Sequence, residues 1–418
     1  MRPWQRFLRT SLIWTLGLGA FSGLLYATIL VAQAPIPEDA HYLGSHACGT
    51  CHWNAHRGWE DSLHPKMMRP VDQEGVVVAD FHPGKMPFDP QQAVWAIGSR
   101  FEQQFMGHDG RTETLLPGSW LVDKGEWKTK GWDGWQVPVP LQRCHGCHTV
   151  GLDVETGRFV EPGIGCESCH GPGSWHRNTL GLGAIASTLD AQVCGPCHTR
   201  GLSTDGKHFF PVAYQIGEPL EDYFRESRPT LGQNSAAWWG NGREHKRHQE
   251  YGAWKRGGHA DSLQSLTDGY DGRYGEITSA CLRCHAAEAA ADPRRDFTLD
   301  EVEHGITCAV CHNVHGRLEA ARYQCSYCHE QGAFFHQPER NADHEVCGAK
   351  AEVTCVECHM PLTAKNGGGL NLHTHHPGII PPADTEKYGV PSSCANGDCH
   401  TDEATDWLQA ALDRHYAP

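Results

Sequence analysis

The sequence predicts a fold made mostly of loops and short α-helices, with a β-rich insertion and an N-terminal transmembrane or signal helix. Hydrophobic residues account for only 39% of the 418 residues, whereas glycine (47) and proline (25) are abundant. Cysteine and histidine recur in short motifs along the whole chain. Such a chain cannot build an ordinary aliphatic core, so large bound groups packed against aromatic side chains must supply much of its apolar interior.

Eight motifs have the form Cys-x-x-Cys-His, and a ninth has four residues between its cysteines. We number them in chain order as motifs 1 to 9: Cys48, Cys51 and His52; Cys144, Cys147 and His148; Cys166, Cys169 and His170; Cys194, Cys197 and His198; Cys281, Cys284 and His285; Cys308, Cys311 and His312; Cys325, Cys328 and His329; Cys355, Cys358 and His359; Cys394, Cys399 and His400. Each motif supplies two thiols for thioether bonds to the haem vinyl groups and one imidazole for the iron. Zinc sites do not require a histidine directly after the second cysteine. The sequence therefore predicts a covalent array of nine haem c groups, eight from strict motifs and one from the stretched motif.

The motif histidines are the predicted proximal iron ligands, and the chain holds enough others to give every iron a second imidazole. There are 29 histidines in all, but only six methionines for the His/Met alternative. Candidates for the distal position are His64, His176, His248, His259, His304, His315 and His375, the last chosen from a cluster with His373 and His376. For each candidate, a solvated histidine or one that only supports a ligand is the alternative. His145, inside motif 2, is not expected to bind the haem of its own motif.

Two of the distal candidates belong to an internal echo. Trp59 is followed five residues later by His64, after motif 1, and Trp254 is followed five residues later by His259, before motif 5. On a helix, the tryptophan would pack on a haem while the histidine reaches an iron from the next turn. The alternative is a pair of surface histidines.

The N-terminus carries an export signal. Three arginines precede an uncharged run, Ser11 to Ala32, that is long enough to span a bilayer as a helix, and positive charge before the run keeps the N-terminus cytoplasmic. Ala32-Gln33-Ala34 resembles a cleavage site, but Pro35 would follow the cut, which favours an uncleaved signal-anchor over a removed signal peptide. The rest of the chain is expected at the periplasmic face of the inner membrane if anchored, or in the periplasm or outside the cell if cleaved.

The motifs fall into two groups. We predict a signal segment at 1–34, a tetrahaem domain at 35–205, a haem-free connector at 206–244 and a pentahaem domain at 245–418. A β-rich insertion is expected at about 70–140, where Val76-Val77-Val78, several tryptophans and turn pairs such as Asp109-Gly110 predict short strands and hairpins. Closely spaced motifs, such as 2 and 3 or 6 and 7, leave no room for separate haem domains. Neighbouring haems should therefore lie edge to edge or stacked.

Charge and cysteine count limit the partners. The net charge of −15 argues against nucleic acid and favours basic redox partner proteins, although an acidic surface without a specific partner would carry the same charge. The motifs use 18 of the 19 cysteines. Cys347 remains, either as a buried inert thiol or as a surface thiol that bridges to a partner.

The first group of motifs resembles the tetrahaem cytochrome that accepts electrons from hydroxylamine oxidoreductase. The most specific segment is Gly-Ile-Gly-Cys-Glu-Ser-Cys-His-Gly-Pro-Gly at 163–173. Motif 1 with Trp59 and His64 is similar to the first haem of that family and its downstream histidine, and residues 143–151 are similar to its second haem. The order of the four motifs is kept, but the insertion after motif 1 is long.

The second group resembles larger multihaem cytochromes that carry the same domain. The similarity lies in residues 242–262, 304–316, 355–361 and 399–416. The last motif of that family normally has two intervening residues, whereas this chain has four. The sequence has no lysine-containing variant motif, so the lysine-ligated catalytic haem of multihaem nitrite reductases has no counterpart in it.

We therefore expect an electron-transfer protein rather than an enzyme, in which mostly bis-histidine haems pass electrons between a membrane donor and a periplasmic or extracellular acceptor. Two alternatives stay open. The resemblance permits an oxidoreductase that acts on a small nitrogen or sulfur compound at one open-coordinate haem. The third interpretation is a subunit of a polymeric cytochrome wire, a homo-oligomer or a larger cytochrome complex, and a membrane anchor would disfavour a free filament.

Overall fold

The structure, a computed structural model, describes residues 30–32, 34–108, 113–129, 140–269, 272, 275–316, 325–329, 354–397 and 399–415. The predicted N-terminal helix lies almost entirely outside these residues. Cys347 also lies outside them. Within the described ranges, no helix is both long and apolar enough to cross a membrane.

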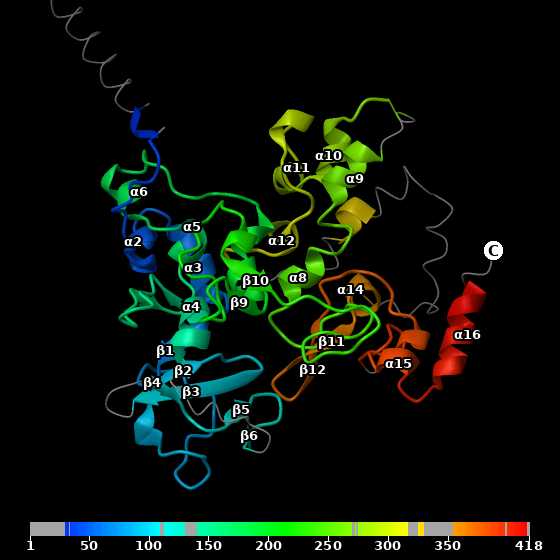
Figure 1. The fold of residues 1–418 in the computed structure, drawn as a ribbon, viewed down its shortest axis with the longest axis horizontal. Coiled ribbons are helices and arrows are strands. Elements are labelled where there is room, and N and C mark those ends of the chain that lie inside the picture. Colours follow the sequence, from blue (N-terminus) through cyan, green and yellow to red (C-terminus); the bar gives the residue numbers. More distant parts are fainter. Residues whose placement is uncertain are drawn as a thin grey trace, which may run out of the picture.

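Short helices joined by long loops form most of the molecule, as predicted (Figure 1). The α-helices are α2 (Ser45–Gly49), α3 (Trp53–Asp61), α4 (His145–His148), α5 (Glu167–His170), α6 (Ser174–Asn178), α7 (Gly195–His198), α8 (Glu250–Trp254), α9 (Ser262–Asp268), α10 (Ser279–His285), α11 (Ala287–Ala291), α12 (Cys308–Cys311), α14 (Cys355–His359), α15 (Pro382–Tyr388) and α16 (Thr405–His415). The 3₁₀ turns are η1 (Pro65–Met67), η2 (Pro90–Gln92), η4 (Ala191–Val193), η5 (Leu220–Asp222) and η6 (Leu299–Glu301), and η3 (Pro140–Cys144) is a π-helix. Few of these helices could be stable alone, because isolated helices shorter than about 12 residues are marginal in water.

The haem motifs explain why so many helices are a single turn. In motifs 1, 3, 4 and 6, the backbone N–H of the motif histidine donates to the carbonyl of the first cysteine over 2.9–3.1 Å. This bond closes one α-turn and puts the first cysteine and the histidine on one helix face. In motif 9 a longer turn is closed instead, since His400 N–H donates to the Cys394 carbonyl six residues earlier over 3.2 Å. The stretched motif therefore still joins its first cysteine to its histidine by a backbone hydrogen bond.

A six-stranded antiparallel sheet occupies the predicted β-rich insertion and stands apart from the helices (Figure 1). Its strands are β1 (Met68–Pro70), β2 (Ala93–Ile97), β3 (Glu102–His108), β4 (Glu113–Leu115), β5 (Ser119–Leu121) and β6 (Glu126–Lys128). The order is β1-β2-β3-β5-β6, and β4 pairs with β3. Val76, Phe105 and Leu116 form a buried core on which Phe88 and Trp127 pack. The insertion thus has an aromatic core of its own.

The prediction of a strand at Val76-Val77-Val78 is wrong. These residues have no regular secondary structure, because the buried side chain of Gln103 replaces a neighbouring strand. Its Oε1 accepts hydrogen bonds from the backbone N–H groups of Val78 (2.8 Å) and Ala79 (3.2 Å), and its Nε2 donates to the Val76 carbonyl (2.9 Å). One amide side chain therefore satisfies the backbone that a ladder would otherwise pair.

Three small hairpins complete the fold: β7 (Thr149–Val150) with β8 (Glu161–Pro162), β9 (Gly201–Ser203) with β10 (Phe224–Glu226), and β11 (Leu362–Asn366) with β12 (Gly369–His373). The predicted connector packs into the body of the molecule. Its Leu220 and Phe224 form a buried cluster with Ala191 and Tyr251, and Trp239 packs against Ile380 in the C-terminal part. The connector therefore ties the two predicted haem domains together.

Candidate haem-binding site

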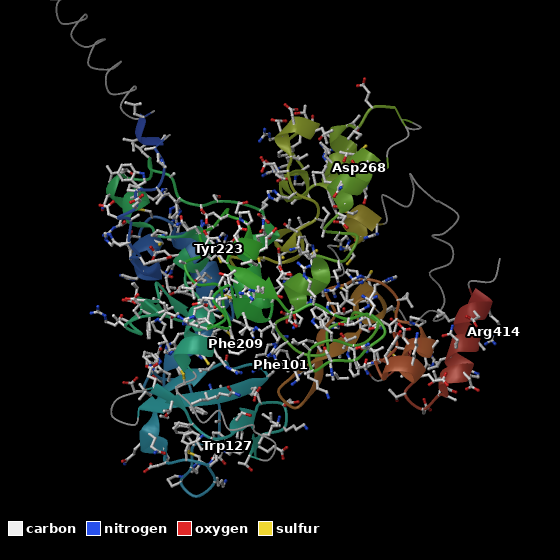
Figure 2. All side chains as sticks on the ribbon, in the orientation of Figure 1. Phe101, Trp127, Phe209, Tyr223, Asp268 and Arg414 are labelled. Atoms are coloured by element: carbon white, nitrogen blue, oxygen red, sulfur yellow. The ribbon has the colours of Figure 1, made fainter. Side chains whose placement is uncertain are left out.

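One large cavity runs through the described part of the chain. Its volume is about 5260 Å³, several times the roughly 300–1,000 Å³ of a site for one small ligand. Residues from Ile36 to Leu412 line it, and they include every motif histidine except that of motif 2. Motif 2 lines the cavity with Cys147. Next to this motif, the guanidinium of Arg143 lies 3.9 Å from the ring centroid of Phe209 in the connector, and Figure 2 labels Phe209. A cavity of this size, lined by cysteines and histidines, suits several large prosthetic groups.

Four motif histidines each face a predicted distal histidine across this cavity. The pairs, with the distances between ring centroids, are His52 and His176 (6.1 Å), His170 and His315 (6.0 Å), His312 and His375 (6.1 Å), and His329 and His259 (5.9 Å). Two imidazoles bound to opposite faces of one metal ion, each with a metal–nitrogen bond of about 2 Å, have centroids about 6 Å apart. Simple aromatic pairs also lie about 4.5–7 Å apart. Four pairings of a motif histidine with a distant histidine, all lining one cavity, favour the metal interpretation.

Burial keeps several of these imidazoles neutral, as iron ligation requires. It lowers the pKa of His64, His148 and His312 to about 4 and that of His248 to about 3. The charge of His198 also lowers the pKa of His64, and the charge of His64 in turn lowers the pKa of His312. His64 therefore lies in the region of motifs 4 and 6.

Backbone carbonyls orient a further set of rings. The Nδ1 atom lies within hydrogen-bonding distance of a carbonyl oxygen in the pairs His148 and Met67 (3.2 Å), His170 and Ala186 (2.7 Å), His176 and Gly183 (2.9 Å), His248 and Cys197 (2.9 Å), and His285 and Ser262 (3.1 Å). A carbonyl at Nδ1 fixes the proton there and leaves Nε2 free to bind a metal, as is usual around metal-bound histidines. These residues fit haem iron, with the motif cysteines providing the covalent bonds.

Contacts between cysteines of different motifs reveal a repeat. First cysteines are within hydrogen-bonding reach of each other in motifs 1 and 3, 4 and 6, and 7 and 8: Cys48 and Cys166, Cys194 and Cys308, Cys325 and Cys355. Second cysteines meet in motifs 2 and 4, and 5 and 7: Cys147 and Cys197, Cys284 and Cys328. Cys169 and Cys194 also lie near enough for their charges to interact, and so do Cys311 and Cys325, which relates motif 3 to 4 and motif 6 to 7. Motifs 4 to 7 therefore repeat the contacts of motifs 1 to 4.

The Trp-to-His echo belongs to this repeat. Trp59 Nε1 donates to the Ile164 carbonyl and Trp254 Nε1 donates to the Ile306 carbonyl, both over 2.8 Å. Each isoleucine also donates its own N–H to the carbonyl of the echoed histidine, Ile164 to His64 and Ile306 to His259. The two tryptophans thus dock equivalent segments onto motifs 3 and 6. The echoed histidines His64 and His259 are half-buried and line the cavity, whereas the alternative would place both on the surface.

Two histidines from the sequence analysis lie elsewhere. His304 lines a separate pocket of about 410 Å³ and its Nδ1 lies 2.6 Å from Glu288 Oε1. No motif histidine among the described residues faces it. His145 is 3% exposed, with Nε2 2.8 Å from Glu113 Oε2 on the sheet, so it links motif 2 to the insertion.

Two acidic residues of the site escaped sequence reasoning. Glu250 Oε2 lies 3.4 Å from Nδ1 of His198, and Glu244 Oε1 lies 3.7 Å from Nδ1 of His375. Burial opposes a charge on His198, but Glu250 outweighs it and raises the pKa of that imidazole to about 9. The only sequence signal was the position of both carboxylates among histidines and arginines in 242–262.

Comparison with known proteins supports this reading. Residues 124–171 and 244–313 match the family described as cytochrome c554 and c-prime, and these segments hold motifs 2 and 3 and motifs 5 and 6. The fold is similar to that of the outer cell wall cytochrome OcwA, with a TM-score of 0.77 and 28% identity over 89% of this chain and 86% of that one. No curated protein matches the chain.

The undecahaem cytochrome from the S-layer of Carboxydothermus ferrireducens shares the fold, with a TM-score of 0.56 and 19% identity over 91% of this chain and 61% of that one. Together with the motifs, these similarities support a multihaem c-type cytochrome with a role in electron transfer.

Proposed function

We propose that this chain is a nonahaem c-type cytochrome that relays electrons through closely spaced, mostly bis-histidine haems. The observation that carries the proposal is the continuous series of motif cysteines that lie near one another. It runs from motif 1 through 3, 4, 6 and 7 to motif 8, with motif 2 beside 4 and motif 5 beside 7. Each cysteine would carry the edge of a haem, so neighbouring cysteines would bring haem edges near one another.

Motif 9 extends the series. Ser393, next to its first cysteine, donates from Oγ to the carbonyl of Cys358 in motif 8 over 2.6 Å. The contacts also cross the boundary between the predicted tetrahaem and pentahaem domains, because motif 4 meets motif 6. The division into two domains stays a prediction. Electrons could pass from one group of motifs to the other directly, from motif 4 to motif 6.

Both ends of the series reach the surface, where they could exchange electrons with partners. Cys51 in motif 1 and Cys399 in motif 9 are exposed, as are Cys169 in motif 3 and Cys355 in motif 8. Trp407 beside His400 is 47% exposed, with ring centroids 6.0 Å apart. When bound, the haems supply the electron-carrying chemistry, and the chain binds them and orients the imidazoles.

We further propose that the protein is exported and takes electrons from a membrane donor to a periplasmic or extracellular acceptor. Relatives described as outer cell wall and S-layer cytochromes support export, and so does the N-terminal segment. Sequencing the N-terminus of the mature protein distinguishes an anchored from a released form. An intact anchor would place it on the inner membrane and disfavour a free polymeric wire.

One observation favours the rival function, oxidation or reduction of a small nitrogen or sulfur compound. The ring that faces His400 is that of Trp407, which is not an iron ligand. The resemblance to the partner of hydroxylamine oxidoreductase points to nitrogen compounds. Electron paramagnetic resonance (EPR) and assays with nitrite and hydroxylamine test it, because all-low-spin iron without turnover would leave only the relay.

A potentiometric titration followed by absorbance tests the relay itself. Haems with different ligand surroundings should titrate over a broad range of potentials. A single narrow wave, or an intact mass with few haems, would contradict a multi-centre relay.

A further inference from the structure

Glu250 sits between two candidate haem sites. It begins α8 and lines the cavity. Besides its contact with His198 in motif 4, its charge acts on His375 and on His312, the imidazole pair of motif 6. Motifs 4 and 6 are themselves in contact through Cys194 and Cys308. One carboxylate therefore faces ligands of two adjacent haems.

Several other imidazoles have a neutral partner at Nδ1. Those of motifs 2, 3 and 5 and the candidate distal His176 and His248 lie against backbone carbonyls, as described above. At His198 and His375, by contrast, a carboxylate stands within ion-pair distance of Nδ1. Both distances exceed that of a strong hydrogen bond. The carboxylates act mainly as negative charges beside the rings.

Positive charge nearby offsets Glu250 only in part. Its Oε1 accepts the backbone N–H of His248 (3.0 Å), whereas Oε2 has no hydrogen bond within the described chain. Arg200 is the cation on which its charge acts, but the guanidinium donates Nε–H to the Arg247 carbonyl. Glu244 is more fully compensated, since it accepts from Thr374 Oγ1 and lies near Arg243 and Arg256. The negative charge of Glu250 should therefore act on the nearby imidazoles more strongly than that of Glu244.

A fixed negative charge beside an iron ligand favours the oxidised iron, because the ferric site carries one more positive charge than the ferrous site. We propose that Glu250, with a smaller effect from Glu244, makes the haems of motifs 4 and 6 the lowest-potential pair of the array. The inference rests on the proposed relay. Cysteines of motif 4 lie near those of motifs 2, 3 and 6, so this pair is the junction between the two halves. On reduction, the haems on either side of the junction would be reduced before the haems of motifs 4 and 6.

The test is Glu250→Gln in the full haem-loaded protein, followed by potentiometric titration with optical and EPR detection. The two haems that reduce last in the wild type should move to higher potential, while haem count by intact mass and low-spin signals stay unchanged. Glu250→Asp keeps the charge and should restore most of the wild-type order. Glu226→Gln is the matched control, because it removes a carboxylate that pairs with Lys255 beside α8 and touches no imidazole.

Unmoved potentials in a fully loaded Glu250→Gln protein would overturn the inference, and so would an equal shift in Glu226→Gln. If Glu250→Gln loses haem, Glu244→Gln gives the answer. The lowest pair must then move upward in Glu244→Gln and stay in place in Glu250→Asp, and any other result refutes the proposal. Failure of the relay is distinguishable, since it would show as a single narrow wave in the wild type.

Discussion

The imidazole rings of His170 and His315 lie 6.0 Å apart and within 7° of parallel. His170 ends motif 3 and His315 follows motif 6, so one haem site draws its two candidate ligands from different halves of the chain. His315 carbonyl oxygen also packs against Gly58 of α3, where a Cβ would come within 1.8 Å of it. The N-terminal and C-terminal motifs therefore close around shared sites, and neither group is complete alone.

His315→Ala should open one iron and no other. Loss of the imidazole would leave water or an empty position on the haem of motif 3, which raises its potential and produces a high-spin signal. EPR of the oxidised protein measures this. His46→Ala, on an exposed position of α2, should leave the spectrum unchanged. A wild-type spectrum in His315→Ala would mean that the pair is only an aromatic contact.

Trp59→Phe should destabilise the protein by about 1 kcal/mol or more, because the Ile164 carbonyl loses its indole donor. Denaturant unfolding followed at the haem absorbance measures the change. Trp53→Phe provides the comparison, since Trp53 is on the same helix and 60% exposed. Equal stability of the two variants would show that the docking bond contributes nothing.

Replacing Cys394 and Cys399 together with serine should lower the intact mass by one haem in addition to the side-chain changes. The reason is that motif 9 also joins its histidine to its first cysteine, with His400 N–H donating to the Cys394 carbonyl. A mass difference explained by the two substitutions alone would show that motif 9 carries no haem and that the array has eight.

Short local patterns were enough to predict the haem motifs and the candidate histidines, but not which residues pair in the tertiary structure. Spacing predicted the motifs and the candidate histidines His176, His259 and His315, because the residues that define a haem motif are neighbours in the sequence. It could not tell which iron each would face, since His176 pairs with motif 1 and His259 with motif 7. The valines at 76–78 misled for the same reason: a side chain distant in sequence, Gln103, satisfies their backbone.

Gln103→Leu should destabilise the inserted sheet by roughly 1–3 kcal/mol, the cost of one buried unsatisfied group. It removes the hydrogen-bond partner of the buried Val76 carbonyl and also those of the partly exposed N–H groups of Val78 and Ala79. Thermal unfolding followed by tryptophan fluorescence reports on this segment. Gln104→Leu changes the neighbouring position on the opposite face of β3 and should cost much less. A Gln103→Leu protein as stable as Gln104→Leu would contradict this account.

The most direct test of the relay is stopped-flow oxidation of the fully reduced protein with less oxidant than it has haems. If the haems form one connected array, electrons redistribute within each molecule. The spectrum directly after mixing should then equal the equilibrium spectrum at the same extent of oxidation, at every protein concentration. A slow drift toward equilibrium whose rate rises with protein concentration would show that haems exchange electrons only between molecules, and would contradict the relay.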